Sequence, residues 1–204
     1  MISTLPSLFT VIGPVLAWSS VMLLAIASLC CMLFALRSPR RPLVYVAAGL
    51  LALAVLIATL PAPHAPELLR VLIGLVAIAL SIAGGGPASQ LALALASGGG
   101  AVAGVHGGIV IAERATPAEQ AAGVQPTREV LRGGATIGFL ERLATTVTIM
   151  AGFPEAIAVV VAIKGVGRFT ELEASEAKER FIIGTFTSLI WACACAALFR
   201  LTAG

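Results

Sequence analysis

The feature that most constrains the fold is a set of long apolar runs, most of them without charge. These runs cover residues 11–36, 43–60, 68–83, 135–152 and 181–198. A helix needs about 20 apolar residues to cross the hydrocarbon core of a bilayer. The 204-residue chain is 59% hydrophobic and 11% charged, whereas soluble domains have about 45–50% apolar and about 25% charged residues. Lipid must solvate this excess, so the sequence predicts a polytopic membrane protein.

Basic residues predict which ends of the runs face the cytoplasm. The turn at residues 37–42, RSPRRP, holds three arginines, and short cytoplasmic loops carry an excess of Lys and Arg. No basic residue precedes Arg37, so no secretory signal peptide is expected. A shorter run at 154–167 completes an all-α bundle of about six spans with both termini outside. This topology leaves only Arg70 and Arg200 outside, with Arg142 inside the membrane.

A glycine-rich stretch between the third and fourth spans forms a predicted connector. Residues 84–87, GGGP, predict a break that ends the third span. Residues 91–112 are uncharged and long enough to cross, but a crossing there would place the basic loop 113–132 outside. We therefore prefer an irregular segment against the cytoplasmic face, with a short helix over 88–97 and a strand-like piece around 109–111. The glycine run matches neither of the common nucleotide-binding patterns.

The charges gather in the last of three predicted regions. The first region, 1–86, has three spans, the second, 87–133, is the Gly/Ala-rich connector, and the third, 134–204, is a three-span module with a charged hairpin. The hairpin joins the fourth and fifth spans through a turn at residues 152–155. The fifth span has about 14 residues, or about 21 Å at 1.5 Å per residue, against a core of about 30 Å. Either the bilayer thins here or basic side chains extend to the headgroups.

Four charged residues form a predicted intramembrane cluster in this hairpin: Glu141, Arg142, Lys164 and Arg168. An antiparallel hairpin places Glu141 and Lys164 at the same depth. Because a lone carboxylate in lipid costs several kcal/mol, we expect a Glu141–Lys164 or Glu141–Arg168 ion pair. Arg142 points about 100° away around the helix and requires either lipid headgroups or another helix. The cluster is interpreted as a clamp between helices, with an ion, proton or anion path as the alternative.

Small residues predict two faces for close helix packing. Gly134 and Gly138 form a GxxxG pattern in the fourth span, and Gly184 and Ser188 have the same spacing in the sixth. The four cysteines, all in apolar runs, are interpreted as small packing residues, with a redox or metal role as the alternative. Asp is absent from the chain, and no metal site or cofactor is expected.

The third region resembles a family of small, uncharacterised bacterial polytopic membrane proteins. The shared pattern is GG-x-x-IG-x-LER, then A-x-K-x-x-x-RF, then IGT-x-x-S. It covers about a quarter of the chain, at Gly133, Gly134, Ile137, Gly138, Leu140, Glu141, Arg142, Gly152, Ala156, Ile157, Ala162, Lys164, Arg168, Phe169, Arg180, Ile183, Gly184, Thr185 and Ser188. The resemblance implies a multi-pass protein of the bacterial plasma membrane and carries over no activity.

These features predict a non-enzymatic structural or assembly subunit of a membrane complex. Its expected partners are the lipid bilayer and either further copies of itself or a larger membrane protein. No basic stripe with interleaved aromatics is present, so nucleic-acid binding is not expected. The alternative is a transporter or channel component for a small solute, ion or proton, in which the four-residue cluster lines the path.

Overall fold

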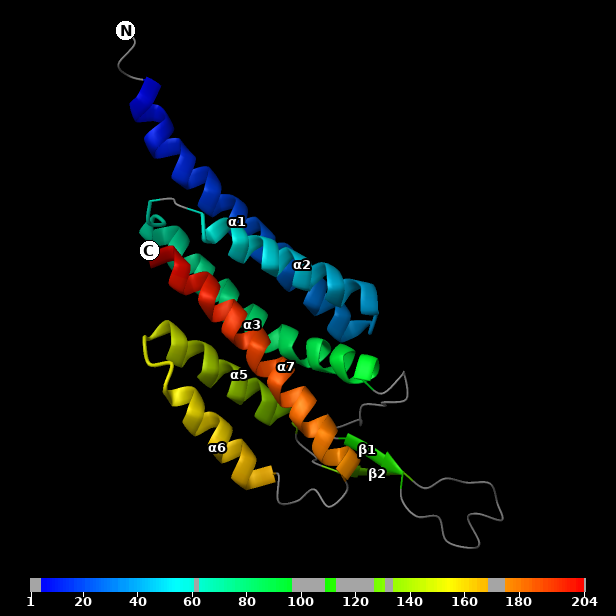
Figure 1. The fold of residues 1–204 in the computed structure, drawn as a ribbon. Coiled ribbons are helices and arrows are strands. Elements are labelled where there is room, and N and C mark those ends of the chain that lie inside the picture. Colours follow the sequence, from blue (N-terminus) through cyan, green and yellow to red (C-terminus); the bar gives the residue numbers. More distant parts are fainter. Residues whose placement is uncertain are drawn as a thin grey trace, which may run out of the picture.

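The computed structural model describes residues 5–60, 63–96, 109–112, 127–130, 134–168 and 175–203. Within these ranges the chain forms six α-helices, two short strands and one 3₁₀ turn (Figure 1). In chain order these are α1 (Leu5–Arg37), α2 (Arg41–Ala58), α3 (Glu67–Ala96), β1 (Ile109–Ala112), β2 (Thr127–Val130), α5 (Gly134–Met150), α6 (Ala156–Arg168), α7 (Ser175–Arg200) and η2 (Leu201–Ala203).

Four of these helices are long and apolar enough to cross a membrane, namely α1, α2, α3 and α7. Their outward surfaces carry large apolar side chains, such as Leu23, Leu75 and Ile190, with 60–68% of each side chain exposed. Such a surface is unfavourable in water and favourable in lipid. α5 and α6 are shorter, at 17 and 13 residues. The described chain is therefore a helical bundle with the character of a membrane protein.

The predicted break at residues 84–87 is wrong, because α3 runs through it and continues to Ala96. A Cβ added at Gly84 would collide with the Trp191 ring, and one added at Gly85 with the Arg142 side chain. The glycines therefore let α7 and α5 approach α3 closely, and these contacts outweigh the weak helix preference of glycine. Pro87 lies inside the helix, so the predicted border between regions 1–86 and 87–133 falls within one continuous element.

The rest of the predicted connector is described only in part. The short helix expected over 88–97 is the last part of α3, so residues 91–96 continue that helix and do not begin another crossing. The strand expected around 109–111 is confirmed as β1, which pairs antiparallel with β2. Residues 97–108, 113–126 and 131–133 lie outside the described residues.

The charged segment at 170–180 was expected to contain a helix N-cap at Ser175, and α7 does begin at Ser175. Residues 169–174 lie outside the described ranges. The turn between α5 and α6 is present, and Gly152 has a φ of 87°, a left-handed conformation that glycine adopts without strain.

α7 has a central place in the bundle. It lies along α3 and also contacts α5 and α2, while α1 packs against α2 and α3 (Figure 1). α6 lies at the edge of the bundle and makes its main helix contact with α5. The bundle therefore has a core of α1, α2, α3, α5 and α7, to which α6 is attached through α5.

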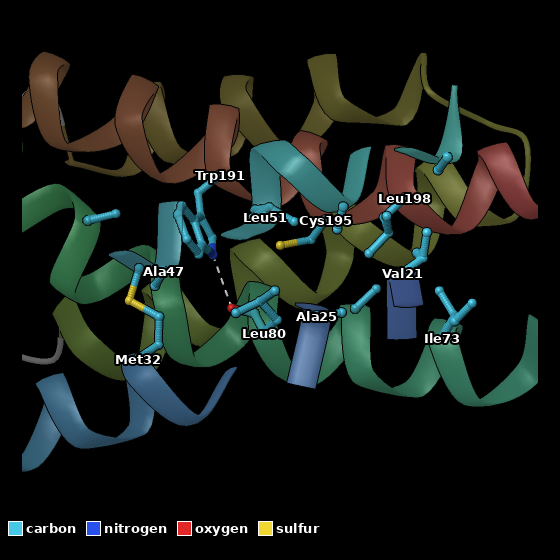
Figure 2. Close-up of a cluster of buried hydrophobic side chains, with 14 of the residues drawn as sticks. Val21, Ala25, Met32, Ala47, Leu51, Ile73, Leu80, Trp191, Cys195 and Leu198 are labelled. Carbon is cyan, nitrogen blue, oxygen red and sulfur yellow. Dashed lines mark hydrogen bonds between the residues drawn. The ribbon is translucent and has the colours of Figure 1, made fainter. Parts of the chain in front are cut away.

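The apolar core lies between α1, α2, α3 and α7 (Figure 2). Met32, Ile73, Leu80 and Leu198 are fully buried there. Trp191 also packs into the core, and its indole N–H donates to the Leu80 carbonyl at 3.0 Å. This bond satisfies the one polar group of a large aromatic side chain in an apolar setting.

Candidate functional site

A cavity of about 660 Å³ lies where the α1–α2 turn approaches the C-terminal part of α3, and parts of α5, α6 and α7 complete its wall. Much of the wall is apolar, with Leu36, Val44, Leu91, Ile137 and Phe181 among its members. Its charged members are five cationic side chains and one carboxylate, Arg40, Arg41, Arg142, Lys164, Arg180 and Glu141. The cavity therefore combines an apolar wall with an excess of positive charge.

The cavity contains the predicted ion pair between α5 and α6. Lys164 Nζ donates to Glu141 Oε2, and both side chains are largely withdrawn from solvent, with 17% and 13% exposed. Lys164 Nζ also lies 5.7 Å from the centroid of the Phe181 ring on α7. The expectation of a Glu141 pair is thus confirmed with Lys164 as the partner. The side chain of Arg168, the other expected partner, lies outside the described residues.

Arg142 links α5 to two other helices. Its side chain is buried, with only 5% exposed. Nε donates to the Ile82 carbonyl of α3 at 3.2 Å, and Nη1 donates to Ser188 Oγ of α7 at 3.1 Å. The guanidinium also lies over the Phe139 ring, 5.2 Å from its centroid. Of the two environments expected for Arg142, headgroups or another helix, the structure shows the second.

The small residues predicted to pack helices have different neighbours. Gly184 and Ser188 contact other helices, since the Ser89 hydroxyl of α3 donates to the Gly184 carbonyl at 3.0 Å and Ser188 binds the guanidinium of α5. A Cβ at Gly138 would lie 3.2 Å from Nη1 of Arg142. Gly138 therefore makes room for a side chain of its own helix rather than for a second backbone. Gly134 begins α5 and lines the cavity.

A packed polar layer lies one helical turn beyond the charges on α5. Thr145, Thr146 and Ser81 are fully buried and are not part of the cavity wall. Thr146 Oγ1 donates to Ser81 Oγ at 2.6 Å, whereas the hydroxyl of Thr145 has no partner among the described residues. These hydroxyl-bearing side chains therefore lie outside the cavity wall, one helical turn along α5 from Glu141 and Arg142.

The described residues do not assemble a metal-binding group of three or more His, Cys, Asp or Glu side chains. All four cysteines are free, and Cys195 is fully buried in the core. This position supports the interpretation of Cys195 as a small packing residue. The chemical capacity of the site is thus electrostatic: it can hold an anion through its cationic side chains.

Sequence reasoning missed the contribution of Arg40, Arg41 and Arg180 to the same cavity as the hairpin charges. These residues were expected on the cytoplasmic side, but only as marks of orientation. The signal was present, because α1, α3 and α5–α6 were all predicted to have ends on that side. What the sequence did not show is that the α1–α2 turn lies close enough to α5 and α6 to share one cavity with them.

No protein family, curated protein or solved structure matches this chain. The resemblance to a family of bacterial membrane proteins therefore stays a prediction, and the function must be argued from the geometry.

Proposed function

We propose that this chain is a multi-pass protein of the bacterial plasma membrane with about six membrane segments and both ends outside. The contacts at one end of the bundle support this topology. The Ala65 amide, in the α2–α3 linker, donates to the Thr202 carbonyl at 3.2 Å, and Gly152, in the α5–α6 turn, lies close to Arg200. All of these segments belong to the outer side in the proposed topology. The arginine-rich α1–α2 turn belongs to the inner side.

α5 and α6 are short for membrane segments. They measure about 26 and about 20 Å at 1.5 Å per residue, less than the ~30 Å hydrocarbon core. Lys164 lies close to the C-terminal end of α6, where a long basic side chain can reach the headgroup region. In this arrangement the hairpin crosses a locally thinned bilayer, with its charges near the inner boundary.

The proposed role is that of a non-enzymatic structural or assembly subunit of a membrane complex. The observation that carries it is that the buried charges of α5 bind groups of the chain's own helices: Glu141 binds α6, and Arg142 binds α3 and α7. Charges used in this way fix the arrangement of helices. The surface available for assembly is the outer face of α6, where Val159, Ile163 and Val166 are 59–76% exposed. The occupant of that face is a second copy of the chain or a larger membrane protein.

A charge-exchange cycle tests the structural role. Glu141→Lys and Lys164→Glu each place like charges opposite one another at a buried site, and we expect both to lower accumulation in the membrane. The double exchange restores an opposite pair, so we expect it to recover both accumulation and particle mass in mild detergent. Glu155→Lys, at the exposed α5–α6 turn, makes the same chemical change outside the pair and serves as the control. Normal accumulation of both single variants would refute the role.

One observation favours a second candidate, a transporter or channel component for a small solute. Glu141, Arg142 and Lys164 all line the cavity, as a solute path through the charged cluster would require. Thr145 and Thr146 are fully buried one helical turn along α5 from the cavity charges, so transport past them would require the helices to move. Anion uptake by vesicles containing the protein tests this function, and uptake that is lost in Lys164→Gln while the protein still folds would establish it.

A further inference from the structure

The cavity has more positive charge than its own residues neutralise. Its one carboxylate, Glu141, already binds Lys164. The bonding partners of Arg142 are a carbonyl and a hydroxyl, neither of which carries a charge. Arg40 and Arg41 are exposed and form no ion pair with any residue that the structure describes. The cavity is therefore suited to an occupant with negative charge.

The same cavity has an extended apolar wall. Leu36 and Val44 from the α1–α2 hairpin, Leu91 from α3 and Ile137 from α5 contribute to it. A volume of about 660 Å³ lies within the range of about 300–1,000 Å³ usual for small-molecule sites. A small inorganic anion would leave most of this wall without a partner. An amphiphile would fill it, since its charged group would contact the arginines and its hydrocarbon the apolar side chains.

The position of the cavity identifies the kind of amphiphile. Its wall includes the α1–α2 turn, the C-terminal part of α3 and the N-terminal part of α7. These are ends of the four helices that are long and apolar enough to cross a bilayer (Figure 1). In a membrane, the ends of crossing helices lie at the depth of the lipid headgroups. Basic pockets between helices at the cytoplasmic face recognise anionic headgroups.

We propose that this cavity binds one anionic phospholipid, with its phosphate held by Arg40 and Arg41 and its acyl chains along the apolar wall. The inference rests on the membrane location proposed above and is independent of the subunit role. A soluble phosphate shares the recognised chemistry, but it would make no use of Leu36, Val44 or Leu91.

Native mass spectrometry of the full chain in mild detergent tests the proposal, with phosphatidylglycerol and phosphatidylcholine as the probes. We expect one phosphatidylglycerol per chain, bound at least about tenfold more tightly than phosphatidylcholine, which has no net charge. Arg40→Gln with Arg41→Gln should weaken phosphatidylglycerol binding roughly thirtyfold. Arg37→Gln with Arg200→Gln removes the same charge outside the cavity wall and should change binding less than about threefold. Equal binding of the two lipids, or equal effects of the two double variants, would overturn the proposal.

Two further measurements separate the remaining explanations. Ala94→Trp keeps every charge but fills part of the cavity, so we expect it to reduce lipid binding while helix content and elution volume stay normal. Unchanged lipid binding in this variant would place the lipid elsewhere. Inorganic phosphate at millimolar concentration should not displace the lipid, and displacement would identify a soluble anion as the occupant. The charge-exchange cycle measures accumulation in the membrane, whereas this assay measures lipid affinity. Failure of the proposed subunit role is therefore distinguishable from failure of the proposed lipid site.

Discussion

Adjacent glycines of α3 should respond in opposite directions to the same substitution. A Cβ at Gly85 would fall less than 3.0 Å from the Arg142 side chain, whereas one at Gly86 would meet no atom within 4 Å. Overpacking of this kind costs about 1–3 kcal/mol, and alanine recovers about 0.5–1 kcal/mol through its stronger helix preference. We therefore expect Gly85→Ala to lower the free energy of unfolding by about 0.5–2 kcal/mol, and Gly86→Ala to raise it by up to about 1 kcal/mol.

The assay is the thermal midpoint of the purified protein in mild detergent, followed by the loss of the folded peak on size exclusion. One kcal/mol corresponds to about 2–4 °C for a chain of this size, so a difference of about 2 kcal/mol, near the middle of these ranges, should separate the two variants by roughly 4–8 °C. Gly86→Ala is the matched control, because it makes the same chemical change in the same helix. If the two thermal midpoints move in the same direction by similar amounts, the close contact between Gly85 and the Arg142 side chain is refuted.

A double-mutant cycle identifies the cause of the difference. Arg142→Ala removes the side chain that a new Cβ at Gly85 would meet. In that background we expect Gly85→Ala to lose most of its penalty, which appears as a coupling energy of about 1–2 kcal/mol. A coupling energy near zero would show that the penalty arises from another contact.

Three other outcomes follow from the contacts in the bundle. Trp191→Phe removes the indole donor and its hydrogen bond to the Leu80 carbonyl, which keeps its backbone bond within α3, so we expect the free energy of unfolding in detergent to fall by about 0.5–1.5 kcal/mol. Thr146→Val alone leaves the Ser81 hydroxyl without its partner, and we expect the added Ser81→Ala to recover part of the lost thermal stability. An apolar maleimide should label Cys30, which is exposed, within minutes, and Cys195, which is buried, only after unfolding. Peptide mass spectrometry measures the labelled fraction of each cysteine, and rapid labelling of Cys195 would contradict its place in the core.

Apart from the course of α3, the helices were predictable, because apolar runs bounded by charged residues, prolines or glycines define them without reference to the rest of the chain. The ion pair between Glu141 and Lys164 was predictable for a similar reason. The two residues are 23 positions apart and belong to one hairpin, so nearly equal numbers of residues on either side of the turn place them at about one depth. Local sequence patterns were sufficient to predict contacts between segments that are adjacent in the chain.

The course of α3 was not predictable from such patterns. A run of glycines followed by proline is a strong local signal for a break, and in this chain tertiary contacts override it. The contacts come from Arg142, which binds a carbonyl 60 positions away, and from Trp191, which binds one 111 positions away. The partners of Arg142 were unpredictable for the same reason, since they depend on which helices lie beside α5 and not on the sequence around it.

The partners of Arg142 are made at different times during synthesis of the chain. At about 5–20 residues per second, the 46 positions between Arg142 and Ser188 take roughly 2–9 s to translate. Glu141 gains Lys164 halfway through this interval, so the α5–α6 hairpin can close while Arg142 still lacks its bond to α7. During those seconds the guanidinium has the α3 carbonyl and the Phe139 ring of its own helix as internal partners. The arrival of α7 then supplies the Ser188 hydroxyl, the Trp191 ring and a large share of the packing on α3 together. We therefore expect the bundle to close late in synthesis, when α7 reaches α3 and α5.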